Sequence, residues 1–124
     1  MSVPIRRGGV YWVDDRVVGL PPTETDKRNF HPRRPFLVVS NDDRNCEDDW
    51  PMVLGYPIST ADHFRSEFDV PLPKGAANLP DRCHVQVALA QPIAKTKVLD
   101  RLGQVDANTM ELVVARFISY VVPD

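Results

Sequence analysis

Short apolar segments separated by turn-forming and charged residues run along most of this chain, which is typical of a β-rich domain. Aromatic and β-branched residues favour strands, and they fill segments 10–13, 36–39 and 52–58. Segment 68–72 alternates like a half-buried strand, and segment 83–90 carries Val85, Val87 and Leu89 at every second position. Segment 98–105 is irregular or a short strand. The pattern therefore predicts a series of short strands.

The stretch 33–42 places two arginines directly before one of these strands. Proline fixes φ at about −65° and cannot donate to a sheet ladder, so we expect Pro35 at the first residue of its strand. Residues 36–39 then form a buried strand, and 40–42 form the turn that ends it. Arg34 would sit beside the rigid start of a core strand, where a phosphate-binding group can be held in place.

The clearest helical pattern lies at the C-terminal end of the chain. Asp106 suits the N-cap position, and its charge suits the positive end of the helix dipole. Apolar residues then recur at helical spacing, and Pro123 prevents continuation. This stripe consists of Met110, Val113, Val114, Phe117 and Val121. Short strands with one packed helix predict a mostly β fold with a C-terminal α-helix, built as a small β-barrel.

Composition limits the classes of function. With 124 residues, 43% of them hydrophobic, and a formal net charge of -2, the chain suits a single domain over residues 1–124. Strong nucleic-acid binders usually carry a basic excess, so an RNA site here would be a local basic patch. The two cysteines, Cys46 and Cys83, are too few for a disulfide framework. With no signal peptide and no apolar run of about 20 residues, we expect a cytoplasmic protein without a membrane span.

One basic segment with aromatic rings could form such a patch. Its positive side chains could follow an RNA backbone while a ring stacks on a splayed base; the alternative is a solvated loop. The segment contains Lys27, Arg28, Phe30, His31, Arg33 and Arg34. Trp50 is a further candidate stacking ring, or else a loop anchor that covers the barrel.

The sequence carries no metal or cofactor signature. His31, His63 and His84 lie far apart, and neither cysteine has a neighbour at ligand spacing. Phosphate-binding loops and hydrolase nucleophile motifs are also lacking. An enzyme of this sequence would therefore act without metal or organic cofactor. RNA permits this, because its 2′-OH is an internal nucleophile beside the phosphate.

Several segments, in order, resemble motifs of the MazF/PemK/Kid toxins of bacterial toxin–antitoxin pairs. Residues 7–14 (RGGVYWVD) and 34–42 (RPFLVVSND) resemble the first two strand motifs. Further matches are 53–60, which contains Pro57-Ile58-Ser59, then 68–72, 87–90 and 101–105, followed by the helix that opens at Asp106. The resemblance covers nearly the whole chain.

The resemblance implies an SH3-like barrel that cleaves single-stranded RNA without metal, by transphosphorylation from the 2′-OH. It also implies a homodimer and a cognate MazE-like antitoxin. Arg34 matches the family's catalytic arginine and Ser59 matches its threonine at the end of the third strand. A hydroxyl there can hydrogen-bond a phosphate oxygen, and the adjacent Thr60 could substitute after a one-residue shift.

The chain also departs from the family pattern. Where some relatives carry an acidic residue, this chain has Ala90, Gln91 and Ala94, and a longer segment, 17–33, replaces the glycine-rich first loop. The general base is therefore open; His31 is the best local candidate because imidazole titrates near neutral pH. Two alternatives to the ribonuclease stand: a barrel that binds RNA or protein without cleavage, and a CcdB-like gyrase poison. Against the latter, residues 121–124 lack a tryptophan.

Overall fold

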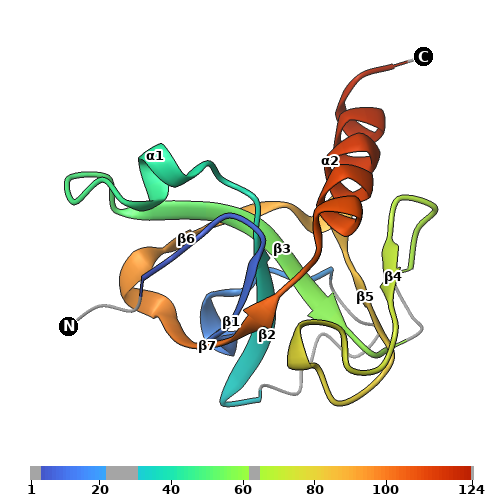
Figure 1. Ribbon diagram of the computed structural model, residues 1–124, viewed down its shortest axis with the longest axis horizontal. Coiled ribbons are helices and arrows are strands. Elements are labelled where there is room, and N and C mark those ends of the chain that lie inside the picture. Colours follow the sequence, from blue (N-terminus) through green and yellow to red (C-terminus); the bar gives the residue numbers. More distant parts are fainter. Residues whose placement is uncertain (1–3, 22–30, 62–64, 124) are drawn as a thin grey trace.

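The computed structural model describes residues 4–21, 31–61 and 65–123, in which a curved antiparallel sheet packs against a C-terminal helix (Figure 1). The strands are β1 Gly9–Asp14, β2 Arg33–Val38, β3 Met52–Ser59, β4 Val70–Leu72, β5 Cys83–Val85, β6 Gln91–Ala94 and β7 Val98–Gln104. The helices are α1 Asp42–Asn45 and α2 Ala107–Val121, with 3-10 turns η1 Asp15–Val17, η2 Ala76–Asn78, η3 Val87–Leu89 and η4 Lys95–Lys97.

Six of the seven strands follow the order β4-β5-β3-β2-β1-β7, and the seventh, β6, pairs with β3. Among the described residues, β4 and β7 at the two ends of this order do not pair with each other, so the sheet curves without closing fully. The predicted class, mostly β with a C-terminal helix, is confirmed. No helix in the described ranges has the length and apolar character needed to cross a bilayer.

The predicted strand at 83–90 is wrong in its extent. Only β5 is a strand there, and η3 follows before β6 begins. Both strands pair with the same edge of β3, where Ile58 lies opposite Val85 and Gly55 lies opposite Gln91. From Val85 to Gln91 the chain runs six residues, whereas the opposing residues of β3, Ile58 and Gly55, are only three apart. The extra residues form η3. The alternation of apolar residues was real, but the edge of β3 determined where pairing stopped.

Pro35 also differs from its expected place. β2 begins at Arg33, so Pro35 is its third residue, opposite Trp12 of β1. Pairing of β2 with β3 starts only at Phe36, opposite Pro57. The proline therefore lies before the central part of the sheet, where a missing N–H would cost a ladder hydrogen bond.

The core has two parts, one on each face of the sheet, because successive side chains alternate between faces. Val10, Leu37 and Tyr56 belong to the part that packs under α2, whereas Tyr11 and Phe36 belong to the other. Figure 1 shows α2 standing over the side of the sheet that carries β4 and β5.

Helix α2 begins where the sequence predicts. Asp106 is its N-cap, and its Oδ1 accepts from the Thr109 N–H at 2.7 Å. Met110 and Val113 of the predicted stripe are buried, but Val121 is 61% exposed. The C-terminal turns of α2 therefore extend beyond the sheet that covers its beginning.

Candidate active site

Three strand ends meet at one end of the sheet. In the β1–β2 ladder, Asp14 at the end of β1 lies opposite Arg33 at the start of β2. In the β2–β3 ladder, Phe36 lies opposite Pro57. Two residues further along the same register, Arg34 comes level with Ser59, and both lie on the face of Phe36 and Pro57. The antiparallel pairing therefore brings together an arginine and a hydroxyl that are far apart in the sequence.

Arg34 is held by a buried carboxylate. Its Nε donates to Asp15 Oδ1 at 2.7 Å, and the two side chains are 14% and 0% exposed. Turn η1 places Asp15 there directly after β1, and Asp14 caps this turn by accepting from the Arg16 N–H at 3.0 Å. The Nη groups of Arg34 make no hydrogen bond to the described residues, so the end of the guanidinium fork can bind an anion.

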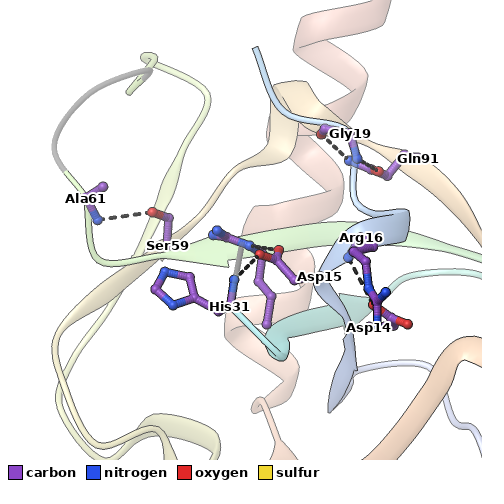
Figure 2. Close-up of polar contacts among 9 residues, drawn as sticks. Asp14, Asp15, Arg16, Gly19, His31, Ser59, Ala61 and Gln91 are labelled. Carbon is purple, nitrogen blue, oxygen red and sulfur yellow. Dashed lines mark hydrogen bonds and ion pairs between the residues drawn. The ribbon is translucent and has the colours of Figure 1, made fainter. Parts of the chain in front are cut away.

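The second oxygen of Asp15 fixes the chain before β2. Asp15 Oδ2 accepts from the His31 N–H at 2.9 Å, so one carboxylate binds both the guanidinium and this backbone. The His31 side chain is exposed. Figure 2 shows His31, Asp15 and Ser59 at the same end of the sheet, with these contacts as dashed lines.

Ser59 is half-buried, and its Oγ accepts from the Ala61 N–H at 3.0 Å (Figure 2). This contact restrains the side chain and leaves the hydroxyl proton available as a donor. Thr60 follows the last residue of β3 and is exposed. Side-chain alternation puts Ser59, and not Thr60, on the face of Arg34.

A comparison with family models identifies the fold's relatives. Residues 6–121 match the model described as PemK-like, MazF-like toxin of type II toxin–antitoxin system. The chain belongs to this family. No curated protein matches the chain significantly.

Solved structures of MazF-like proteins share the fold. MazF from Deinococcus radiodurans superposes with a TM-score of 0.71 at 17% identity, over 96% of this chain and 97% of that one. An endoribonuclease from Mycobacterial species gives a TM-score of 0.70 at 19% identity, over 100% and 98%. A mycobacterial endoribonuclease in complex with its cognate antitoxin gives 0.67 at 20% identity, over 95% and 93%.

This MazF-like chain does not gather every predicted residue at one place. The guanidinium of Arg33 stacks 4.2 Å from the centre of the Trp12 ring, on the face opposite Arg34. Trp50 is 46% exposed and lies two residues before the start of β3, so the length of that strand, roughly 25 Å, separates it from Ser59. Lys27, Arg28 and Phe30 lie outside the described residues.

Gln91, at one of the positions where an acidic residue was sought, has a structural contact. Its Oε1 accepts from the Gly19 N–H at 2.7 Å, and its Nε2 donates to the Gly19 carbonyl at 3.0 Å (Figure 2). The amide therefore fastens the segment after η1 to β6 by two hydrogen bonds that a carboxylate could not both make.

The sequence analysis missed Asp15. The signal was a second carboxylate directly after the first strand, on the same hairpin as the arginine pair. Among the described residues, no cluster of three or more His, Cys, Asp or Glu side chains could hold a metal ion. The polar groups that meet at this end of the sheet are thus a guanidinium, a carboxylate, a hydroxyl and an imidazole.

Proposed function

We propose that this protein is the toxin of a type II toxin–antitoxin system and a sequence-selective, metal-independent endoribonuclease. It acts in the cytoplasm on single-stranded RNA. The observation that carries the proposal is the position of Arg34, which Asp15 orients on the same face as Ser59. Family membership and relatives described as endoribonucleases support the same conclusion.

The reaction is a transphosphorylation. The 2′-OH gives up its proton and its oxygen attacks the adjacent phosphorus. The bond from phosphorus to the 5′-oxygen breaks, and that oxygen takes a proton from water, which regains one from the protonated base. A 2′,3′-cyclic phosphate and a 5′-hydroxyl result. The Nη groups of Arg34 bind the non-bridging oxygens and stabilise the charge that grows on them. The hydroxyl of Ser59 donates a hydrogen bond to the same phosphate.

His31 is the proposed general base. Imidazole can take a proton from the 2′-OH near neutral pH. The exposed side chain can reach an incoming RNA, while the contact of its N–H with Asp15 holds its backbone beside Arg34. The carboxylate of Asp15 is engaged by two donors and acts as a positioning group.

The proposed partners are a second copy of the chain and a MazE-like antitoxin. Large apolar side chains remain exposed on α2 and just after it, and an assembly would cover them. They are Leu112, Ile118, Tyr120, Val121 and Val122. Relatives solved as MazE–MazF complexes support an antitoxin partner.

The test is cleavage of a long mixed-sequence RNA by purified protein in EDTA, with the 5′ ends of the fragments mapped. Arg34→Lys is the informative variant, because it keeps a charge beside Asp15 but loses the guanidinium fork. We expect discrete cuts by the wild type, their loss with Arg34→Lys, and a loss of about tenfold to a thousandfold with Ser59→Ala or His31→Ala.

Thr60→Ala is the matched control for Ser59→Ala, and it should cleave within about twofold of wild type if Ser59 supplies the hydroxyl. Failure of the folded wild type to cleave diverse RNA in EDTA would reject the ribonuclease. Full activity of Arg34→Lys would reject the role of the guanidinium fork.

A further inference from the structure

A cavity of about 610 Å³ lies beyond the end of β3, beside the β4–β5 hairpin. The described residues that line it come from the end of β3, the two strands of the hairpin and the segments that flank them. They are Thr60, Arg65, Pro71, Leu72, Pro73, Arg82, Cys83 and His84. Its volume falls in the range of small-molecule sites, roughly 300–1,000 Å³.

The lining has the chemistry of a nucleotide site. Arg65 and Arg82 bring two positive charges, and the described residues that line the cavity include no carboxylate. Both arginines are exposed, so they keep their hydration until a ligand arrives. Pro71 and Pro73 offer apolar surface on which a base can lie.

The cavity is joined to the active site through the sheet. Ser59 lies opposite His84 in the β3–β5 ladder, and His84 lines the cavity. His84 also lies opposite Pro71 of β4. An RNA bound at Ser59 would therefore reach the cavity across the width of one β-strand, about 5 Å.

The wall between the two sites is rigid. His84 is 3% exposed, and its Nε2 lies 3.5 Å from Oδ2 of Asp69, itself 6% exposed. Ser66 donates to the Asp69 carboxylate through both its N–H and its hydroxyl, at 3.3 and 3.2 Å. The negative charge of Asp69 is thus engaged behind His84 and does not face the opening as an isolated carboxylate.

We infer that this cavity is a nucleotide subsite, which holds the base next to the cleaved bond while Arg65 and Arg82 bind the flanking phosphate. The inference rests on the proposed ribonuclease function and deepens it. It assigns part of the sequence selectivity to the β4–β5 hairpin, because a base inside the cavity is read by the groups that line it. The pKa of the Cys83 thiol is raised to about 11, mainly by burial and then by Asp81, so the thiol itself adds no negative charge to this wall at neutral pH.

The experiment measures binding of a fluorescent random-sequence 2′-fluoro RNA, which lacks the nucleophile and so stays intact with the wild-type protein. Arg65→Gln and Arg82→Gln are compared with Arg101→Gln, an exposed arginine of β7 at the other end of the strand order. We expect each cavity variant to weaken binding by about fivefold to tenfold, and to reduce the slope of log affinity against log salt by about 0.7. Arg101→Gln should stay within about twofold of wild type.

The same variants are assayed for cleavage of ordinary RNA in EDTA. Here the cavity variants should raise KM and keep kcat within about threefold, because they touch a neighbouring nucleotide and not the reacting phosphate. A cleaving wild type whose Arg65→Gln and Arg82→Gln variants bind and cleave normally would overturn the subsite and leave the proposed function intact. A wild type that fails to cleave RNA would reject the ribonuclease itself.

Cys83 supplies a readout independent of activity. In a Cys46→Ser protein, alkylation of Cys83 should slow when 2′-fluoro RNA is bound, since the thiol lines the cavity. Unchanged alkylation at saturating RNA would overturn the inference. The inference would also be overturned if Arg82→Gln weakened binding of an antitoxin peptide and left binding of RNA unchanged, because the cavity would then bind a protein.

Discussion

Arg34 and Asp15 form a nearly buried ion pair, with Nε of the arginine 2.7 Å from Oδ1 of the aspartate. The contact uses the Nε of the guanidinium and leaves the Nη groups without a hydrogen bond to the described residues, at the end of the sheet where β1 and β3 finish and β2 begins. The carboxylate therefore fixes the direction of the fork as well as neutralising its charge.

Asp15→Asn should lower kcat for RNA cleavage by about tenfold to a hundredfold while KM changes little. The amide keeps the shape of the carboxylate but weakens the charged contact that aims Arg34, and small displacements of a catalytic group carry costs of this size. Steady-state cleavage of a defined RNA measures the effect.

Asp14→Asn is the control, since Asp14 is the neighbouring carboxylate and its ion pair with Arg16 is exposed. Asparagine caps a turn as well as aspartate, so its activity should match wild type and its stability should change by less than about 1 kcal/mol. Equal kcat for wild type and Asp15→Asn would contradict the positioning role.

Gly55→Ala should prevent folding. A Cβ at this position would lie 2.1 Å from the carbonyl oxygen of Leu37 on the neighbouring strand, and backbone atoms in a sheet centre cannot move aside cheaply. Gly19→Ala, whose Cβ would meet only Gln91 Oε1 at 3.6 Å, is the matched control. Circular dichroism and thermal melts of both variants test this, and a Gly55→Ala protein that melts like wild type would contradict the packing described.

Tyr56→Phe should stabilise the protein by about 1 kcal/mol at neutral pH. The hydroxyl is buried without a hydrogen-bond partner among the described residues, while the ring packs edge-on against Phe117 at 5.7 Å. Phenylalanine keeps the ring and removes the unsatisfied polar atom. Urea titrations of both proteins give the difference.

The advantage of Tyr56→Phe should widen at alkaline pH. Burial raises the pKa of Tyr56 to about 12 from its ordinary 10.0. The unfolded chain therefore releases this proton first, and the wild type loses stability as the pH rises from about 10 to 12. The phenylalanine variant has no such proton, so a constant difference across this range would contradict the buried hydroxyl.

Alkylation of Cys83 should be slow at neutral pH and rise about tenfold per pH unit until about pH 11. The thiolate is the reactive form, and burial first and Asp81 second raise the pKa of this thiol to about 11. The measurement uses a Cys46→Ser protein and iodoacetamide, with mass spectrometry of the labelled peptide. A plateau of the alkylation rate near pH 9 would contradict this prediction, because the thiol would then titrate as it does in an unfolded chain.

Local patterns predicted the parts of the fold that local forces determine. Strands β1, β2 and β3 follow from their apolar runs, and α2 from its cap and helical spacing. The split into β5 and β6 could not be predicted, because the number of residues that η3 absorbs depends on which β3 residues they pair with.

The site shows the same division. Arg34 and Ser59 were predicted from motifs, and their common face follows from the β2–β3 register. Asp15 was missed because its role depends on the turn η1, which aims it across the hairpin at a residue 19 positions later. The carboxylate directly after the first strand was a signal, but its spacing from Arg34 does not specify the contact.

The two adjacent arginines of β2 point in opposite directions, Arg33 over Trp12 and Arg34 toward Asp15. A slip of this strand by one residue would exchange them, and would at the same time turn Phe36 out of the core. The register that places Arg34 in the candidate site is therefore the register that the fold needs. A chain with β2 paired out of register would not fold, so it could not exist as a folded protein that lacks activity. We therefore expect variants selected for loss of toxicity to fall into two groups. In one group the protein does not fold and does not accumulate in the cell, and in the other a folded protein is altered at one of the few side chains where the strands meet.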